Sequence, residues 1–286
     1  MNRLPIAKRA QILSMLCEGM AMRSAARLAG VSLNTVAKLL VDAGEACALI
    51  HDEHVRGVQS RRIQADEIWS FNYCKQRNVT DEIREKNPNA GDCWTWTALD
   101  ADSKLIVSWH VGGRTTSDAH DFIADLAQRV SGRVQISTDG LSHYPPAVVA
   151  AFGEDVDLGQ VIKIFGKSHN PNRYSPAPCV GCTTIPVLGN PDDAHISTSY
   201  VERSNLSIRM GMRRYTRLTN GFSKKHENHV SMVAIYTVWY NFMKSHKTLG
   251  GKTPAMHAGL SDHKWSFEKI VEMMDQAALV PATQPK

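Results

Sequence analysis

The chain has 286 residues, of which 43% are hydrophobic and 21% charged, and a formal net charge of +5. No run of about 18 apolar residues occurs, and the N-terminus lacks the apolar core of a signal peptide, so we expect neither a membrane span nor secretion. Six scattered cysteines, of which only Cys179 and Cys182 are close in sequence, argue against a disulfide framework and favour a reducing cytoplasm.

The first 43 residues predict a helical DNA-binding domain. Apolar residues at helical spacing follow Pro5, a second helix covers about 23–29, and Gly30 then ends it. Ser32 is placed to cap a third helix, in the pattern of a helix-turn-helix. The start of that third helix enters the major groove in such motifs, so the candidate DNA contacts are Ser32, Asn34, Thr35 and Lys38. The alternative is a three-helix packing module without a DNA-binding role.

Strand patterns begin after a linker helix at 44–60. Apolar and β-branched runs predict strands at 63–72, 93–99, 105–111 and 134–138, with helices at about 118–130 and 144–152. The order predicts a mixed α/β sheet of five strands, with one short strand later in the chain. The first three strands should be antiparallel, and the fourth should lie parallel beside the first.

Two of these strands carry acidic residues that are candidates for a site. Asp66 and Glu67 are adjacent in the first strand, so alternation places them on opposite faces, and we expect Glu67 to point away from the site. Asp139 follows the fourth strand and precedes Gly140, at the sheet edge where open crevices form. Asp139 also fits an ordinary Asp-Gly turn.

A third acid, Glu202, lies in a stretch with helical spacing. Glu202, Leu206, Arg209 and Arg213 fall on one helix face, which would place a carboxylate beside two guanidinium groups. Carboxylates suit a hard metal cation, and arginines suit phosphate oxygens. Ser199 and Glu202 also match a capping box, in which Glu202 would only bond the start of its helix.

The region after Glu202 is strongly basic. Between Arg203 and Lys252 ten Lys and Arg residues stand against one acid, Glu227, a net charge of +9. Such a block predicts a phosphate-facing surface, although a solvated helix face is the common alternative. The candidate phosphate contacts are Arg209, Arg213 and Arg214.

Three motifs together resemble insertion-sequence transposases of the DDE class. They are Asp66-Glu67-Ile68-Trp69, Thr138-Asp139-Gly140 and Tyr200-Val201-Glu202-Arg203-Ser204-Asn205. The stretch from Trp239 to Pro254 also resembles the region that follows the catalytic Glu in such enzymes. The similarity covers nearly the whole chain and is greatest to the insertion-sequence-one type.

The resemblance implies an RNase H-like catalytic domain at 61–260, followed by a C-terminal helix and tail at 261–286. It implies a catalytic and metal-binding triad of Asp66, Asp139 and Glu202, with Asp66 bridging two Mg²⁺ or Mn²⁺ ions. It further implies cleavage and strand transfer of double-stranded DNA by a homo-oligomer bound to the element's ends, in a bacterial cytoplasm on the nucleoid, without a membrane partner.

Asp139 and Glu202 are separated more widely than is usual in this class, so we expect a loop-rich insertion at about 153–197. It contains Cys179-Val180-Gly181-Cys182, for which zinc binding with His169 and His195 is a weaker alternative than free thiols.

Two other functions fit the sequence. A helix-turn-helix regulator would bind DNA without catalysis, and an RNase H-like nuclease would cut DNA without joining it.

Overall fold

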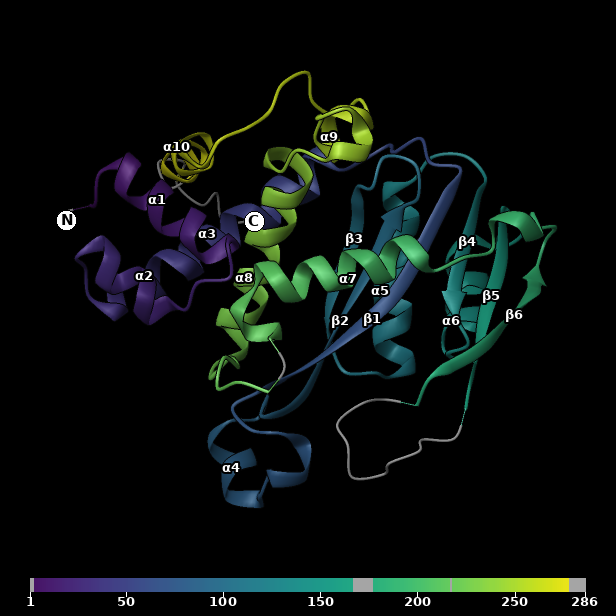
Figure 1. The fold of residues 1–286 in the computed structure, drawn as a ribbon, viewed down its shortest axis with the longest axis horizontal. Helices are drawn as coiled ribbons and strands as arrows, with labels where there is room; N and C mark the ends of the chain where they lie inside the picture. The colour runs from purple at the N-terminus through teal and green to yellow at the C-terminus, as the bar shows by residue number, and fades with distance from the viewer. Residues whose placement is uncertain (1–2, 167–176, 217, 278–286) are drawn as a thin grey trace, which may run out of the picture. The chain divides into compact units, whose positions relative to one another are not determined.

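The computed structural model describes residues 3–166, 177–216 and 218–277 (Figure 1). The chain forms two compact units. The first, called here the helical unit, comprises Met1–Arg56, Trp69–Trp94 and Asn205–Lys286, and the second, the sheet unit, comprises Gly57–Ile68 and Thr95–Ser204. Within the described residues no helix is long and apolar enough to cross a membrane.

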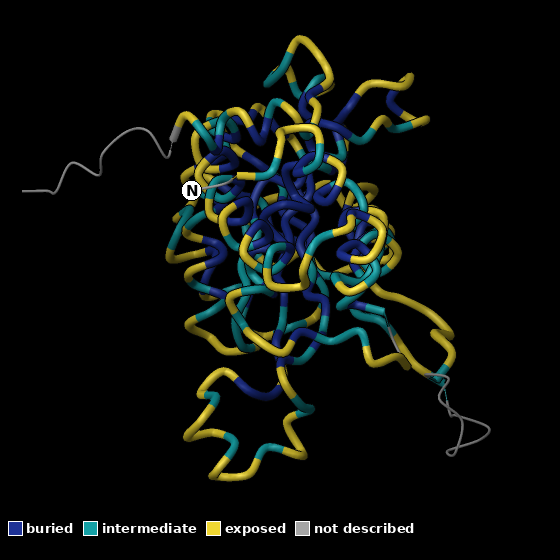
Figure 2. Tube along the Cα trace, turned by 90° about the vertical axis from the view of Figure 1, so that its left-hand side faces the viewer, coloured by how far each residue is buried: buried dark blue, intermediate teal, exposed yellow. Residues whose placement is uncertain are grey.

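The helical unit contains most of the helices in the chain. They are α1 (Ile6–Cys17), α2 (Met22–Ala29), α3 (Leu33–His54), α4 (Asp81–Lys86), α8 (His226–Val238), α9 (Pro254–His257) and α10 (Phe267–Ala277). Short 3₁₀ turns lie at Gln76–Asn78, Arg213–Tyr215 and Lys247–Leu249, and a π-helical turn lies at Trp239–Met243. No residue of α4 is buried, and α4 belongs to the exposed loop at the bottom of Figure 2.

The α2–turn–α3 segment has the local structure that the sequence predicts. Gly30 ends α2 in the left-handed conformation with φ of 63°, which a residue with a side chain seldom adopts. Ser32 caps α3 by accepting a hydrogen bond from the backbone N–H of Thr35 at 3.1 Å. Buried Val36, Leu39 and Leu40 then anchor α3.

The helix α3 crosses the domain boundary expected near residue 43. It runs without a break to His54, because apolar residues recur on its inner face as far as Ile50, and it packs against α8. The C-terminal helix α10 packs against α1, and Arg9 donates two hydrogen bonds to Asp275 at 2.7 and 2.6 Å. Residues 1–43 and the C-terminal helix therefore belong to one compact unit.

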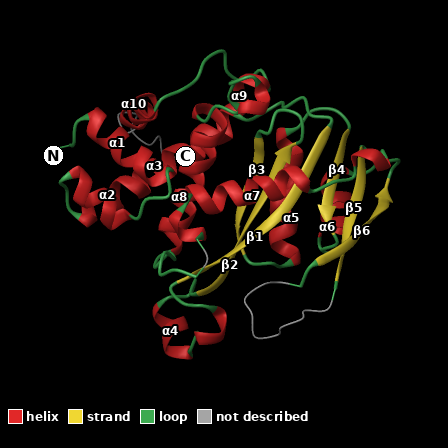
Figure 3. Cartoon of the chain, viewed as in Figure 1, coloured by secondary structure: helices red, strands yellow, loops and turns green. Residues whose placement is uncertain are grey.

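The chain contains a six-stranded mixed sheet (Figure 3). Its strands are β1 (Arg62–Asn72), β2 (Gly91–Asp100), β3 (Ile106–Gly112), β4 (Val134–Asp139), β5 (Val156–Phe165) and β6 (Cys179–Leu188), in the order β3-β2-β1-β4-β5-β6. β4 is parallel to both β1 and β5, and β6 is antiparallel to β5.

The other two neighbouring pairs in the sheet are antiparallel. A short turn joins β2 directly to β3, and the N–H of Ala101, just after β2, bonds to the carbonyl of Arg62 at the start of β1. The four predicted strands therefore pair in one sheet with the predicted directions. The α/β class and an RNase H-like arrangement of the sheet are confirmed.

The expectation of a loop-rich insertion at 153–197 is wrong for its described part. Two ten-residue strands, β5 and β6, occupy most of it, so the sheet has six strands rather than five. Val156, Leu158 and Val161 of β5 are buried, and β6 pairs with the backbone of β5 along its outer edge. The prolines at 171 and 176, which suggested loop structure, lie outside the described residues.

Helices cover both faces of the sheet (Figure 1). The helices α5 (Thr116–Arg129) and α6 (Tyr144–Phe152) pack on one face, where Trp96 of β2 contacts Phe122 and Tyr144. The helix α7 (Ser199–Gly211) begins on the other face, where Gln64 of β1 accepts hydrogen bonds from the N–H groups of Tyr200 and Val201 at 2.8 and 3.1 Å.

Candidate active site

The predicted acids lie on the two strands at the centre of the sheet unit. Asp66 and Glu67 occupy the middle of β1, and Asp139 is the last residue of β4. The N–H of Leu141 donates to Oδ1 of Asp139 at 3.0 Å, which orients the carboxylate just past the strand end. Parallel pairing of β1 with β4 therefore brings residues more than seventy positions apart to one place.

Three carboxylates converge there. Asp66, Glu67 and Asp139 each offer a carboxylate oxygen, and these three atoms lie within 4.8 Å of one another. Convergence of Asp66 with Asp139 agrees with the sequence-based expectation. The expectation that Glu67 points away is wrong, because its carboxylate joins the same group although its strand position alternates with that of Asp66.

Arg114 links Glu67 to Asp139. Its guanidinium lies 3.1 Å from Oε2 of Glu67 and 3.7 Å from Oδ2 of Asp139. One exposed cation thus faces two of the three carboxylates, and it offsets part of their mutual repulsion.

Glu67 is nevertheless in an unfavourable environment for a charge. Burial, followed by the charges of Asp139 and Asp66, raises its pKa to about 7, against the opposing effects of Tyr144 and Arg114. Its Oε1 and the hydroxyl of Tyr144 are both buried, and neither completes a well-formed hydrogen bond, although each group shifts the pKa of the other. A carboxylate oxygen without a hydrogen bond is therefore held inside the group.

Asp66 is also hard to ionise. Burial and the charges of Asp139 and Glu202 raise its pKa to about 6, and Lys163 acts in the opposite direction. Raised pKa values of clustered acids are the expected result when several negative charges share a partly desolvated site.

Glu202 lies near this group but has a different partner. Its Oε1 is 2.7 Å from Nζ of Lys163, a residue of β5, and also accepts a hydrogen bond from the hydroxyl of Thr198. Thr198 precedes α7, so Glu202 does bond the start of its helix, but through a side chain and not through the backbone N–H of a capping box. Glu202 is not in the group of three acids within 4.8 Å found among the described residues.

Lys163 places a positive charge beside the acids. Burial lowers its pKa, but the bond with Glu202 and the charges of Glu202, Asp66 and Asp139 outweigh burial, so the net shift is upward. An ammonium group is thus stabilised at this position by three predicted catalytic acids.

These residues fit a divalent metal ion of the hard, oxygen-preferring kind. The donor set is made of carboxylate oxygens, one of them buried and without a hydrogen bond, and a protein cation is already stabilised beside them. Mg²⁺ and Mn²⁺ prefer such ligands.

The candidate DNA contacts in the helical unit lie at the start of α3. Ser32 and Asn34 are exposed and Thr35 is half-buried, but the hydroxyls of Ser32 and Thr35 also contact each other at 2.9 Å. Lys38 is exposed and pairs with Asp42 at 3.0 Å. Asn34 is therefore an exposed candidate for reading base edges, and Ser32 has a capping role.

The three arginines after Glu202 do not share one helix face. Arg209 lies in the last turn of α7, but α7 ends at Gly211, since Met212 has an extended backbone, and Arg213 belongs to a separate 3₁₀ turn. Helical spacing therefore does not extend from Glu202 to Arg213. Arg214 is half-buried and donates to the carbonyl of Asn228, and burial lowers its pKa to about 10, so its guanidinium already has a partner within the helical unit.

Cys179 and Cys182 are exposed free thiols on β6, and not in a loop as expected. Within the described residues neither belongs to a group of three potential metal ligands. His169, one of the zinc ligands considered, lies outside the described residues.

Sequence reasoning missed three members of the site: Arg114, Tyr144 and Lys163. Arg114 precedes the predicted helix at 118–130, and Tyr144 begins another predicted helix. Lys163 lies in β5, within the region for which the sequence predicts a loop-rich insertion. The only available signal was that Arg114 and Tyr144 flank Asp139 in predicted elements next to the sheet.

No family model matches the chain, and no curated protein matches it. Solved structures show weak similarity. A synaptic complex of piggyBac transposase with hairpin DNA aligns at a TM-score of 0.36 and 10% identity, over 98% of this chain and 73% of that one. A pre-cleavage Mos1 transpososome aligns at 0.30 and 8%, over 96% and 79% of the two chains. A Mos1 strand transfer complex aligns at 0.25 and 11%, over 82% and 78%. Scores this low do not establish a common function.

Proposed function

We propose that this protein is a DDE-type transposase that binds the ends of a mobile DNA element, cuts them and joins them to target DNA. The observation that supports it most directly is the convergence of Asp66 and Asp139 at the centre of an RNase H-like sheet, with Glu202 acting electrostatically on Asp66. The motifs around the same three residues are those that resemble DDE transposases.

Asp66, Asp139 and Glu202 are proposed to hold two Mg²⁺ or Mn²⁺ ions. Bound divalent ions would supply an activated water or 3′-hydroxyl and would stabilise the leaving oxygen of the phosphodiester. The chain's own residues prepare this site: Leu141 orients Asp139, Arg114 faces both Asp139 and Glu67, and Lys163 pairs with the carboxylate of Glu202 and acts electrostatically on Asp66.

The start of α3 is proposed to read the ends of the element, through Asn34 and Thr35, with several copies of the protein assembled on the two ends. Arg209 and Arg213 remain proposed phosphate contacts. Arg214 is left out because its guanidinium has a partner inside the helical unit.

The test is cleavage and joining of DNA that carries the sequences flanking the gene. Asp139→Asn should abolish Mg²⁺-dependent cutting and retain DNA binding, because the substitution removes a charge and keeps the size of the side chain. Asp155→Asn is the matched control, since Asp155 is exposed in the same unit and is not one of the three converging acids.

Loss of cutting in both variants, or cutting that persists in Asp139→Asn, would contradict the assignment. Cutting of ends without joining would identify a nuclease instead. DNA binding without any metal-dependent cutting would identify a regulator.

A further inference from the structure

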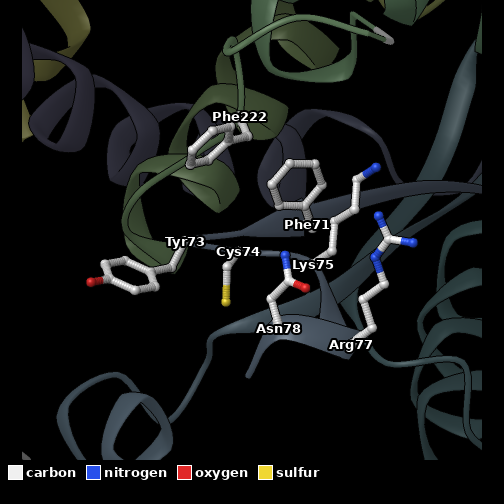
Figure 4. Close-up of a pocket in the computed structure, with 7 residues that line it drawn as sticks. All are labelled: Phe71, Tyr73, Cys74, Lys75, Arg77, Asn78 and Phe222. Atoms are coloured by element: carbon white, nitrogen blue, oxygen red, sulfur yellow. The ribbon is translucent and has the colours of Figure 1, made fainter. Parts of the chain in front are cut away.

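A pocket in the helical unit lies outside the proposed active site. It has a volume of about 330 Å³ and lies where the end of β1 meets the loop that precedes α8 (Figure 4). Its lining contains three aromatic rings, two cationic side chains and no acid: Phe71, Tyr73, Cys74, Lys75, Arg77, Asn78 and Phe222.

We propose that this pocket binds one unpaired nucleotide of DNA, with the base against Phe71 and Phe222 and the neighbouring phosphates beside Lys75 and Arg77. The inference rests on the proposed function, because DNA is the ligand. It assigns to the helical unit the recognition of a distorted or opened position in the DNA.

The aromatic surface is the first reason. The rings of Phe71 and Phe222, drawn in Figure 4, have centroids 4.9 Å apart and are inclined by 30°. The ring of Trp69 lies 5.7 Å from that of Phe71. All three residues are only partly buried, and Tyr73 is 42% exposed. Partly exposed aromatic rings are suited to stacking, which accepts any base because every base has a π face.

The charge of the lining is the second reason. Lys75 and Arg77 lie on the same side of the pocket in Figure 4. In the part of the chain that the structure describes, neither forms an ion pair with a carboxylate, so both charges are available to phosphate. This positive lining favours a nucleotide over an aromatic side chain of a partner protein.

The pocket is built in advance of binding. Tyr73 has a left-handed backbone with φ of 63°, and its N–H donates to the carbonyl of Ser223 at 2.7 Å. Buried His229 contacts the hydroxyls of Ser223, Tyr215 and Ser70 at 3.0, 2.9 and 3.3 Å, which fixes the loop to the strand. A prebuilt surface loses little conformational entropy when a ligand binds.

The size of the pocket selects an unpaired base. In a duplex both faces of a base are covered by its neighbours, so a base must leave the stack before an aromatic side chain can reach it. A volume of about 330 Å³ fits one ring system and not the width of a double helix.

The experiment compares the full-length protein on a paired duplex and on the same duplex with one extra, unpaired thymine, in EDTA to prevent cutting. We expect the wild type to bind the bulged duplex more tightly. Phe222→Ala should reduce that preference by about 5- to 150-fold, the range for loss of one base–aromatic stack. Phe222→Trp should retain it.

Arg77→Ala should weaken binding of the bulged duplex and reduce its salt slope by about one. Two substitutions serve as matched controls and should leave the preference unchanged: Arg84→Ala, an exposed arginine in the same β1–β2 connection, and Tyr200→Ala, an exposed aromatic residue of the sheet unit.

Alkylation of Cys74, a half-buried thiol in the lining, gives a readout that needs no substitution. The bulged duplex should protect Cys74 and the paired duplex should not. Protection of Cys74 therefore tests whether the pocket binds the unpaired base even if Phe222→Ala fails to fold.

The pocket proposal is overturned if the wild type shows no preference for the bulge, or if Phe222→Ala is folded and keeps it. If the wild type still binds and cuts paired ends in those cases, the proposed function stands and the pocket alone fails. If the protein binds no DNA at all, both fail.

Discussion

The carboxylate of Glu67 illustrates how burial and charge combine at a single residue. Only 1% of its side chain is exposed, and the carboxylates of Asp66 and Asp139 are close by. Its pKa is therefore raised from an ordinary 4.5 to about 7. Between these two pH values the folded protein keeps a proton that the unfolded chain has released, so the free energy of unfolding falls as pH rises through this window.

We therefore predict that Glu67→Gln, which imitates the protonated side chain, flattens the decrease in stability between pH 5 and pH 8. The wild-type loss from this residue amounts to at most about 3 kcal/mol, from a shift of roughly 2.5 units at 1.36 kcal/mol per unit. Denaturant unfolding of the metal-free protein at several pH values measures it. The pKa of Asp66 is also raised, so the free energy of unfolding of Glu67→Gln should still decrease somewhat as pH rises.

Glu154→Gln is the control for this prediction. Glu154 is an exposed glutamate of the same unit and should show the wild-type slope when substituted. An unchanged slope in Glu67→Gln would mean that Glu67 is ionised at low cost in the folded protein, and would remove the physical basis for its raised pKa.

At the level of residues, the sequence was sufficient to predict that Asp66 and Asp139 converge, because motif and strand position agreed. The sequence did not predict the position of the Glu67 carboxylate. Alternation along a strand predicts the face of the sheet on which a side chain starts, but not how far its carboxylate extends. The sequence could not predict that Arg114, Tyr144 and Lys163 contact these acids. Such contacts depend on which elements pack together, and nothing in the sequence distinguishes these three residues from the other Arg, Tyr and Lys residues.

The helices α1 and α10 are joined by the pair of Arg9 and Asp275. The Arg9 side chain is 9% exposed and binds the carboxylate through two nitrogens, whereas Arg3, which contacts the same Asp275 at 2.7 Å, is 58% exposed. Exposed ion pairs contribute little to stability, and buried two-point pairs contribute more.

We predict that Arg9→Ala destabilises the protein by about 2 kcal/mol, because Asp275 loses a charge-assisted bond and α10 loses its fixed position against α1. Arg9→Lys should recover only part, since lysine cannot form the two-point contact. Arg3→Ala should change the free energy of unfolding by less than about 1 kcal/mol. If Arg3→Ala and Arg9→Ala lowered the free energy of unfolding equally, the pair of Arg9 and Asp275 would contribute no more than an exposed ion pair, which would contradict this prediction.

At the level of elements, local signals predicted turns and caps well. Gly30 and Ser32 were correctly identified as the end of α2 and the start of α3, because these positions depend on neighbouring residues only. The strands β5 and β6 were missed, since prolines and glycines around 170–190 resemble a loop and the pairing of β5 with β4 is non-local. The continuation of α3 to His54 depends on its packing against α8, which the sequence does not show.

In the whole molecule, the two units divide the proposed work. The residues proposed to read DNA lie in the helical unit, and the acids proposed to hold metal lie in the sheet unit. β1, β2 and α7 each run from one unit into the other, so the chain crosses between them inside regular elements.

This arrangement leads to a prediction about metal and stability that does not depend on catalysis. In metal-free protein the clustered acids repel one another and retain protons, so Mg²⁺, which binds only deprotonated carboxylates of the folded state, should raise the melting temperature. The rise should be larger at pH 8 than at pH 5.5, because the raised pKa values of Asp66 and Glu67, about 6 and 7, mean that protons compete at the lower pH.

Asp139→Asn tests the origin of this effect. It removes one negative charge from the group, so the metal-free variant should melt at or above the wild-type temperature, while its response to Mg²⁺ should largely disappear. Asp155→Asn, an exposed acid of the same unit, should keep the wild-type response. The three melting curves are measured with and without Mg²⁺ by circular dichroism. A full Mg²⁺ response in Asp139→Asn would place the ion elsewhere, because the remaining acids would then be sufficient without the residue at the end of β4.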